Sequence, residues 1–456
     1  MATRPAVAGR VPGPAAASAL RLPLPSLVEA MAAGRLSATD HARTCIAQAQ
    51  AVEPMIHAFK AIDAPSILAR AGAAGPASSL LAGVPFGVKD IIDVGGLVTG
   101  MGSPIHDGAI AATDAPLVAR LKAAGAYVFG KTVTTEFAFM HPRETRNPWH
   151  TGHTPGGSSS GSAAAVAAGC VPAALATQTN GSVIRPAAFC GIVGFKPGFG
   201  VFPVQGVLSY APTLDQAGCY ARSVAGVARI AQALAEPGAG LASAGPCAGR
   251  WAARGDPVPR MVAVRTPAWS RASAPMQAEF ERVQALLSAA GAQVERLELP
   301  ARFTQAHDVH RVIMGHEAVH YFTPVQAVHR RLISDWLNDY LDQAAAIGAA
   351  AYREALAERG RLREDFAHFV AAYDAVLTPP ATGEAPEGID TSGDPVFCSI
   401  WTLLGTPAIT VPTGIGPAGL PFGLQLVGAE GDDAVLLAAA AWCEARLGFA
   451  GLPAGA

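Results

Sequence analysis

Residues 156–165 read GGSSSGSAAA, a cluster of serines set among residues with almost no side chain. Glycine- and serine-rich stretches are most often loops or flexible linkers, so the cluster alone does not define an active site. It matches G-x-S-x-G, which would make Ser159 a nucleophile only if a strand ran directly into it. Residues 147–155 contain two prolines and one glycine and read as a loop instead. The rest of the chain must decide which hydroxyl is reactive.

Strand-like and helix-like segments alternate on both sides of this cluster. The spacing of apolar residues predicts strands over 84–90, 126–129, 260–265, 293–297, 375–377, 408–412 and 423–427. It predicts helices over 27–50, with Ser37 as an N-cap, and over 116–124, 162–168, 274–290, most of 308–372, and 434–446. Such alternation is typical of an α/β fold with one large sheet.

The composition of the 456-residue chain narrows the class of protein. Half of the residues are hydrophobic, 15% are charged and the formal net charge is −2. This predicts a large buried interior and argues against a nucleic-acid partner or an anionic membrane partner. No run reaches the roughly 18 apolar residues that a spanning helix needs, so we expect a soluble protein.

The ends and the cysteines add expectations about organisation. Residues 1–22 lack the apolar core of a signal peptide, so we expect a flexible leader and a cytoplasmic location. Residues 23–456 are expected to form one domain, with a Pro/Gly-rich excursion near 236–256 and a variable helical region near 308–372. The seven scattered cysteines lack CxxC pairing, which favours reduced, mostly buried thiols.

Two further motif matches need weighing. Residues 125–132, GAYVFGKT, satisfy the P-loop pattern, but its central residues are themselves a predicted strand, so Lys131 is expected to be a strand-end lysine. The stretch from His316 to His320, HEAVH, satisfies H-E-x-x-H and could bind zinc on a helix. Pro324 follows soon after and no third ligand is in register, so we favour packing histidines. A zinc peptidase that uses His316, Glu317 and His320 remains an alternative.

Three separated stretches form a more specific pattern: GVPFGVKD over 83–90, TPGGSSSGS over 154–162 and TQTNGSVIRP over 177–186. Here the chain resembles the amidase signature family. Residues 214–224, 402–407 and 419–428 also look like that family, so the resemblance covers about 27–446. It implies a single large domain with a central mixed β-sheet covered on both faces by helices. It also implies hydrolysis of C–N amide bonds by a Ser–Ser–Lys triad, without a cofactor or a metal.

Carried over by position, the family's lysine falls on Lys89, its bridging serine on Ser158 and its nucleophile on Ser182, 24 residues after Ser158. A serine hydroxyl needs an adjacent base, and the three stretches contain no histidine. Lys89 can serve as the base only if burial keeps it largely uncharged, which its apolar neighbours favour. Ser158 can accept from one partner and donate to the other. The family has a cis peptide bond before this serine.

The resemblance assigns two further functions. The backbone N–H groups of Thr179, Asn180, Gly181 and Ser182 are expected to form an oxyanion hole, with Asn180 standing where many relatives have glycine. Arg185 lies three residues after Ser182, as in a malonamidase-like subset whose arginine pairs with a substrate carboxylate.

Several roles stay open. Arg185 could equally form a structural salt bridge to a carboxylate such as Asp215. Ser159 and Ser160 are expected to hold the turn through local hydrogen bonds. The specificity pocket is expected to come from residues 308–349 and 137–140.

The leading hypothesis is an amidohydrolase that acts on a small-molecule amide through a Ser182 acyl-enzyme. An amidotransferase subunit that releases ammonia to a partner enzyme is the main alternative, and the zinc peptidase is a weaker one. The chain could also form a homodimer. The acyl group and the leaving group are not predicted by any motif.

Overall fold

The protein is represented by a computed structural model that describes residues 20–75, 78–241 and 258–455. Most of the predicted leader, Cys247 and most of the predicted excursion near 236–256 lie outside the described residues. The six described cysteines are buried free thiols, which fits the predicted reduced state. No helix of the described residues is long and apolar enough to cross a membrane.

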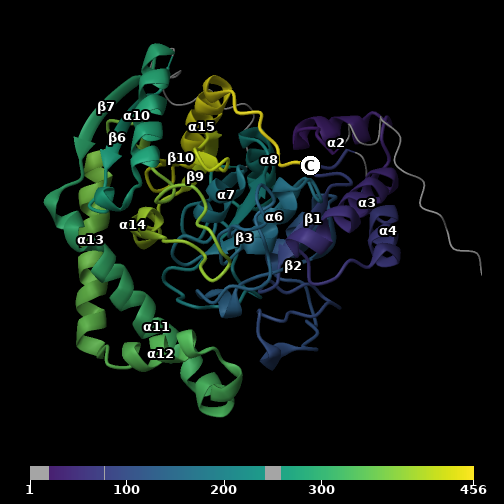
Figure 1. The fold of residues 1–456 in the computed structure, drawn as a ribbon, viewed down its shortest axis with the longest axis horizontal. Helices are drawn as coiled ribbons and strands as arrows, with labels where there is room; N and C mark the ends of the chain where they lie inside the picture. The colour runs from purple at the N-terminus through teal and green to yellow at the C-terminus, as the bar shows by residue number, and fades with distance from the viewer. Residues whose placement is uncertain (1–19, 76–77, 242–257, 456) are drawn as a thin grey trace, which may run out of the picture.

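The described residues form one mixed sheet of ten strands in the order β2-β1-β3-β5-β4-β9-β10-β8-β6-β7 (Figure 1). Pairing is parallel through β2-β1-β3 and through β8-β6-β7, and antiparallel between these two ends. The α/β fold class predicted from the alternation of segments is thereby confirmed. The strands are β1 Pro85–Lys89, β2 Tyr127–Thr132, β3 Ala173–Gln178, β4 Val193–Lys196, β5 Gln216–Ala221, β6 Arg260–Arg265, β7 Gln293–Glu298, β8 Ala375–Thr378, β9 Ala408–Ile415 and β10 Pro421–Val427.

Thirteen α-helices of the described chain pack around this sheet. Ser37 caps the helix that follows it, as predicted, by accepting a hydrogen bond from the Asp40 N–H. The helices are α2 Leu24–Ala32, α3 Ala38–Ile56, α4 Ala64–Gly72, α5 Pro116–Ala123, α6 Ser160–Ala167, α7 Ile184–Cys190, α8 Val224–Leu234, α10 Ala274–Ala289, α11 Ala306–His329, α12 Asp335–Ala344, α13 Ala349–Val370, α14 Val396–Leu404 and α15 Asp433–Leu447.

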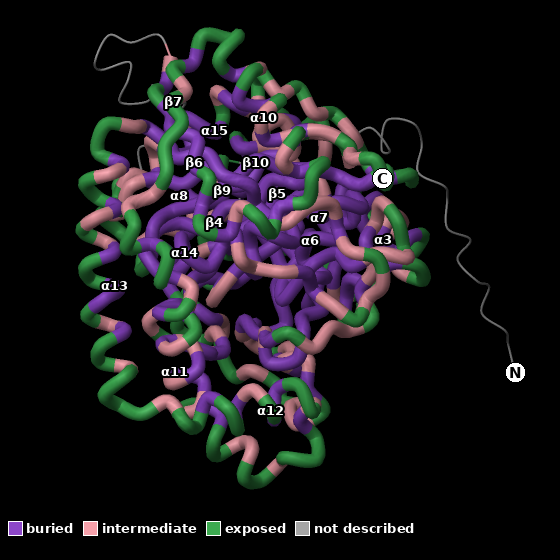
Figure 2. The backbone as a smooth tube through the Cα atoms, turned by 60° about the vertical axis from the view of Figure 1, so that its left-hand side comes forward, coloured by how far each residue is buried: buried purple, intermediate pink, exposed green. Residues whose placement is uncertain are grey.

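The alternation of side chains along β3 shows that helices cover both faces of the sheet. Ala173 and Leu175 pack into a core with α2, α5 and α8, whereas Ala174 and Ala176 pack into a second core with α3, α4 and α6. Successive side chains of a strand point to opposite faces, so the two cores lie on the two sides of the sheet. Figure 2 shows most strands as a buried interior, whereas the edge strand β7 is mainly exposed.

The small residues of the serine cluster allow α6 to pack very closely against its neighbours. Every residue of this helix is buried. A Cβ atom on Gly161 would lie 2.2 Å from the carbonyl oxygen of Ala58 and 2.5 Å from the backbone nitrogen of Val133. Glycine is therefore required where the helix begins, and the loop before α6 is held against the sheet.

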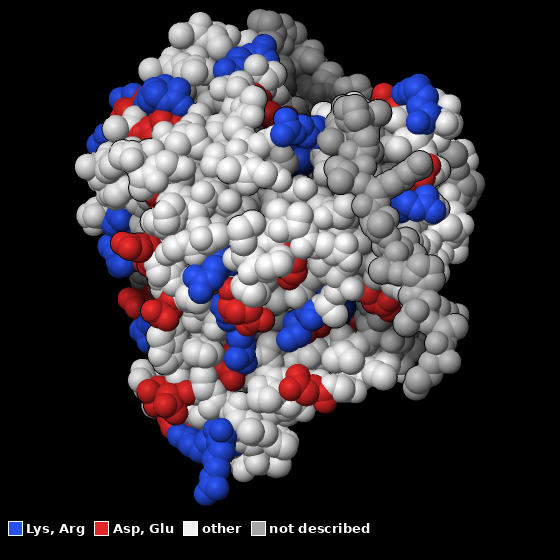
Figure 3. All heavy atoms as spheres, turned by 45° about the vertical axis from the view of Figure 1, so that its right-hand side comes forward, with Lys and Arg blue, Asp and Glu red and all other residues white. Residues whose placement is uncertain are grey.

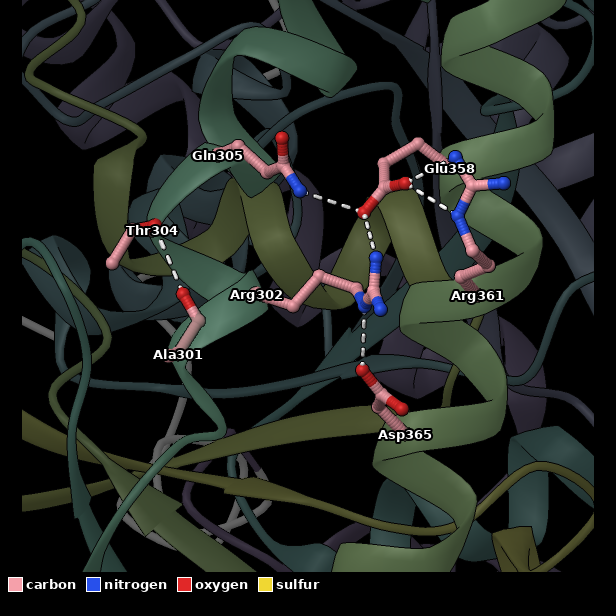
Figure 4. Close-up of polar contacts among 7 residues, drawn as sticks. All are labelled: Ala301, Arg302, Thr304, Gln305, Glu358, Arg361 and Asp365. Carbon is pink, nitrogen blue, oxygen red and sulfur yellow. Dashed lines mark hydrogen bonds and ion pairs between the residues drawn. The ribbon is translucent and has the colours of Figure 1, made fainter.

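Helices α11, α12 and α13 extend away from the sheet, with exposed outer faces (Figures 1 and 2). The start of α11 is tied to α13 by charged and polar side chains (Figure 4). Glu358 on α13 accepts hydrogen bonds from Arg302 at 3.1 Å and from Gln305 at 2.7 Å, both in the 3-10 turn η4 Ala301–Gln305. Because α11 begins at the next residue, these contacts fix its first turn.

Candidate active site

Lys89 ends β1, and its side chain is fully buried. Its Nζ donates hydrogen bonds to Ser158 Oγ at 2.7 Å and to Thr177 Oγ1 at 2.8 Å. Burial lowers the pKa of Lys89 well below its ordinary value, and the opposing effect of Asp215 is smaller. Both partners are neutral hydroxyls rather than carboxylates, so neither contact pairs the amine with a negative charge. The contact with Thr177 was not predicted: this residue begins the stretch 177–186, but the family resemblance assigned it no role.

Ser158 lies in the loop before α6, where the Gly157–Ser158 peptide bond is cis. The next two serines make long-range contacts rather than the predicted local ones. Ser159 Oγ donates to the carbonyl oxygen of Thr177 at 3.2 Å, and Ser160 Oγ donates to that of Val133 at 3.4 Å. The expectation of local hydrogen bonds is wrong because the close approach of α6 brings β3 and the segment after β2 within reach.

Ser182 lies in the turn between β3 and α7 and is buried. The side chain of Gln178 shapes this turn: its Oε1 accepts from the N–H groups of Val183 at 2.8 Å and Ile184 at 3.0 Å. Its Nε2 donates to Thr402 Oγ1 on α14 at 2.9 Å. The role of Gln178 was not predicted. The residue lies in the stretch 177–186, but its hydrogen bonds to the turn become apparent only in the structure.

Two hydrogen bonds from side chains of α14 hold Asn180 in the candidate oxyanion loop. Thr402 Oγ1 donates to the Asn180 carbonyl at 2.7 Å, and Ser399 Oγ donates to Asn180 Oδ1 at 2.6 Å. Within the described part of the chain, no acceptor takes a hydrogen bond from the backbone N–H of Asn180, Gly181 or Ser182. Both serines of the triad are described, and no hydrogen bond joins Ser158 Oγ to Ser182 Oγ, so the proton path between the two hydroxyls stays a prediction.

Arg185 is buried in α7 and points back toward the serine loop. Its Nη2 donates to the carbonyl oxygen of Gly157 at 2.6 Å and to Ser392 Oγ at 3.3 Å. Its Nε and Nη1 are buried without a hydrogen-bond partner among the described residues. The suggested ion pair with Asp215 is not formed, so the guanidinium keeps donors that no described side chain uses.

Asp215 is instead wrapped by the loop that precedes β5. Its carboxylate accepts from Thr179 Oγ1 at 2.5 Å, from the Tyr210 N–H at 2.7 Å and from the Ala211 N–H at 2.9 Å. Burial raises the pKa of Asp215 to about 6, against the lowering effect of these hydrogen bonds. The loop and the start of the candidate oxyanion stretch are thereby joined through one carboxylate.

A small cavity of about 90 Å³ adjoins these residues and is lined in part by Thr177, Thr179, Tyr210 and Asp215. A larger cavity of about 320 Å³ lies elsewhere, beside residues 449–453 near the C-terminal end of the described chain. We regard the smaller one as part of the candidate site, because Thr177 contacts Lys89 directly.

Tyr210, which lines this cavity, belongs to a cluster of aromatic side chains. Phe139 stacks on Tyr210, with ring centroids 5.7 Å apart, and contacts Tyr340 of α12 at 4.7 Å. Phe137 contacts Phe322 of α11 at 5.2 Å. The short aromatic segment and the helical region therefore contact one another through these rings, and their part in specificity stays a prediction.

The P-loop match and the H-E-x-x-H match form hydrogen bonds within the protein. Lys131 lies within β2 and donates to the carbonyl oxygen of Ile92 at 2.8 Å, so the P-loop match is part of a strand and not a phosphate-binding loop. In α11, both oxygens of Glu317 accept from Thr213, and His316 Nδ1 lies 3.0 Å from the Ile347 carbonyl. Among the described residues, no three His, Cys, Asp or Glu side chains are grouped to hold a metal ion.

Comparison with known proteins identifies the family and agrees with this fold. The Amidase family model matches residues 40–437, and the chain belongs to this family, whose enzymes act on C–N bonds. A glutamyl-tRNA(Gln) amidotransferase subunit from Symbiobacterium thermophilum is 34% identical over 455 residues, covering 89% of this chain and 92% of that relative.

Solved structures that resemble this chain include small-molecule and peptide amidases. The 6-aminohexanoate cyclic dimer hydrolase with bound substrate matches with a TM-score of 0.82 and 25% identity, over 95% of this chain and 99% of the other. Native peptide amidase from Stenotrophomonas maltophilia matches with a TM-score of 0.76 and 28% identity, over 95% and 98%. Membership of the family predicted from the three stretches is confirmed.

Proposed function

We propose that the protein is an amidohydrolase that cleaves a C–N amide bond of a small molecule through a Ser182 acyl-enzyme. The observation that carries this proposal is the hydrogen bond from Lys89 Nζ to Ser158 Oγ at 2.7 Å, made by a fully buried amine. A lysine whose charged form is disfavoured by burial can accept a proton near neutral pH. It is therefore suited to act as the general base.

The reaction is written as two acyl-transfer steps. Ser182 Oγ attacks the amide carbonyl carbon while its proton passes to Ser158 and the Ser158 proton passes to Lys89. The tetrahedral intermediate collapses as the same path returns a proton to the leaving nitrogen, which departs as ammonia or an amine. Water then attacks the acyl-enzyme while Lys89 takes its proton through Ser158. The second tetrahedral intermediate collapses as that proton returns by the same path to Ser182 Oγ, which releases the carboxylic acid and regenerates the serine.

The unused N–H groups of Asn180, Gly181 and Ser182 support their assignment, with Thr179, to the oxyanion hole. Donors that are already fixed in place stabilise negative charge in the transition state without having to reorganise. The hydrogen bonds to Asn180 from Ser399 and Thr402 supply that fixation. An asparagine at this position is therefore compatible with the role.

Arg185 supports a substrate class within this proposal. A fully buried guanidinium with two nitrogens that lack a partner among the described residues favours an anionic group opposite it, because a buried charge is costly when it is not paired. We propose that the preferred substrates are amides that carry a carboxylate. The hydrogen bond to Gly157 would hold the guanidinium in place for that contact.

The test compares the purified chain with its Ser182→Ala variant on acidic, neutral aliphatic, aromatic and urea-like amides. Wild-type hydrolysis and its loss in the variant, with an unchanged melting temperature, are the expected results. Isolation of an acyl-enzyme on Ser182 by mass spectrometry would identify the acyl group. Full activity in Ser182→Ala would rule the proposal out.

The second candidate is an amidotransferase subunit, which the 34% identity to the glutamyl-tRNA(Gln) amidotransferase relative favours. Such a subunit would use the same groups to release ammonia from glutamine toward a partner. The two functions differ in what the isolated chain can do: an amidohydrolase turns over its substrate alone, whereas the subunit would need a copurifying partner and glutamine for full activity. Activity assays with and without the host-cell proteins that copurify distinguish them.

A further inference from the structure

Helix α11 carries two buried polar side chains on one face, His310 and Glu317, seven residues and therefore about two turns apart. His310 Nε2 lies 3.0 Å from the carbonyl oxygen of Thr179, the first residue of the candidate oxyanion loop. A carbonyl can only accept, so the hydrogen bond requires the proton on Nε2. Burial lowers the pKa of His310 to about 4, which keeps the imidazole neutral while it donates.

Glu317 is linked to the candidate oxyanion loop indirectly, through the loop that precedes β5. Its Oε2 accepts from the Thr213 N–H at 3.0 Å, and its Oε1 accepts from Thr213 Oγ1 at 2.7 Å. Thr213 stands two residues before Asp215, whose carboxylate accepts from Thr179 Oγ1 at 2.5 Å. One side chain of α11 therefore contacts the Thr179 carbonyl directly, and the other contacts the loop that holds the Thr179 hydroxyl.

We propose that His310 and Glu317 are positioning residues that fix the Thr179 end of the oxyanion loop and thereby set the rate of acylation at Ser182. The inference rests on the function proposed above. Donors to a developing oxyanion are effective only when they are held in place before the reaction, and small displacements of such groups slow catalysis strongly. In this reading the glutamate of the H-E-x-x-H match acts through a loop and not through a metal.

The same helix offers a matched control in His316. Its Nδ1 lies 3.0 Å from the Ile347 carbonyl, the same distance as in the His310 contact, and its ring stacks on Tyr352 at 4.3 Å. The Tyr352 hydroxyl donates to Glu317 Oε1 at 2.7 Å, and His316→Leu keeps an apolar contact with the Tyr352 ring. Each histidine of α11 therefore lies against a backbone carbonyl, but of the two only His310 contacts the candidate oxyanion loop directly. A general loss of helix stability should follow from either substitution, whereas a loss of loop positioning should follow only from His310.

The experiment measures how fast a fluorophosphonate labels Ser182 in the full chain, followed by intact-mass spectrometry, together with the melting temperature. This reagent needs the nucleophile and the oxyanion donors but no knowledge of the natural substrate. His310→Leu should slow labelling about tenfold, the effect of one lost hydrogen bond in the transition state. His310→Gln, whose amide can still donate to Thr179, should restore most of the rate, and His316→Leu should label at the wild-type rate.

Thr213→Val supplies a second variant in case His310→Leu does not fold, because it removes one of the two hydroxyls that donate to Glu317 Oε1 and leaves that of Tyr352. It should slow labelling about fivefold. Wild-type labelling rates in Thr213→Val and His310→Leu, or equal losses in His310→Leu and His316→Leu, would overturn the positioning role alone. A wild-type protein that labels no faster than Ser182→Ala would overturn the proposed function and this inference with it.

Discussion

The guanidinium of Arg185 and the carbonyl of Gly157 are joined by a hydrogen bond of 2.6 Å across the gap between α7 and the serine loop. Gly157 directly precedes Ser158, so an arginine that stands three residues after the proposed nucleophile also contacts the segment of the proposed proton relay. The remaining guanidinium nitrogens have no partner among the described residues. Arg185 therefore has one nitrogen bound to the backbone and two nitrogens left for the proposed contact with a substrate carboxylate.

Replacing Arg185 by methionine should separate these two roles. Loss of a charge-assisted pair with a substrate carboxylate costs about 1.5–3 kcal/mol, so KM for carboxylate-bearing amides should rise roughly tenfold to a hundredfold. Loss of the contact with Gly157 should lower kcat for every amide alike. Steady-state kinetics on a carboxylate-bearing amide and its uncharged methyl ester analogue measure both effects. Equal changes on the two substrates would contradict a carboxylate site.

Lys89→Met should abolish amide hydrolysis and yet stabilise the fold. Burial holds the pKa of Lys89 below its value in the unfolded chain, about 10.4, so between the two values the unfolded state binds more protons. Wild-type stability therefore rises with pH across that interval, and the cost of the buried amine is greatest at its acidic end. The stabilisation by methionine should accordingly shrink as the pH rises.

Denaturant unfolding of both proteins at a series of pH values measures this difference. Lys196 is another buried lysine, and burial lowers its pKa to about 7. Both proteins retain it, so its contribution cancels in the difference between their free energies of unfolding. Wild-type activity should correspondingly increase with pH as Lys89 loses its proton. A pH-independent stability difference, or activity that increases as the pH falls, would be inconsistent with Lys89 as a neutral base.

Gln178→Leu should weaken both the fold and the site. It would leave the N–H groups of Val183 and Ile184 without their acceptor, at a cost of about 1–3 kcal/mol for each buried donor that finds no replacement. The turn that carries Ser182 should then be less well fixed, and labelling of Ser182 should slow. Unfolding and labelling rates measured on the same samples check both effects. Gln178→Glu keeps the acceptor and should retain more stability than the leucine variant.

Gly161→Ala tests the close packing of α6. The added Cβ atom would lie within 2.2–2.9 Å of backbone atoms of Ala58 and Val133, which cannot move as a flexible side chain would. We expect destabilisation of at least about 3 kcal/mol, at the upper end of overpacking effects. Gly360→Ala is the control, because no described neighbour lies within 4 Å of that position inside α13. It should stabilise the protein by about 0.5–1 kcal/mol, and thermal unfolding compares the two.

Much of the fold could be predicted because its outer elements have regular patterns. The strand over 260–265 and the helix that begins at Ala274 were predicted at the positions where the structure has β6 and α10. Strands β3, β4 and β5 were missed. Their residues are largely alanine, glycine and polar side chains buried on both faces, so neither alternation nor a run of large apolar residues marks them.

The candidate site shows the same division. Lys89, Ser158 and Ser182 could be named because a family resemblance gives them positions, and the structure brings Lys89 and Ser158 into contact. Thr177 and Gln178 open the third of these stretches, but no role was assigned to them, since their contacts arise only when β3 lies beside β1 and the turn folds back on its own strand. Interactions between residues far apart in the chain leave no local pattern in the sequence.

The near-neutral net charge of −2 agrees with a surface on which both signs are mixed. On the face shown in Figure 3, lysine and arginine are interspersed with aspartate and glutamate, and no broad region of one sign is visible. Several charges of the described chain are paired, for example Arg330 with Asp342 of α12 at 2.5 Å. Exposed pairs of this kind contribute at most about 1 kcal/mol each, so the extension depends mainly on its buried contacts.

The extension of α11, α12 and α13 has a consequence for redesign. The three proposed triad residues come from one continuous part of the chain, 89–182, whereas α11 and α12 supply Phe322 and Tyr340 to the aromatic cluster that includes the cavity-lining Tyr210. A graft of these helices between family members could therefore exchange substrate preference as a unit while leaving the proton path in its own segment. Such a chimera would need to keep its interior polar contacts matched to the recipient's loops, whereas its solvent-facing residues could be chosen freely for expression or immobilisation.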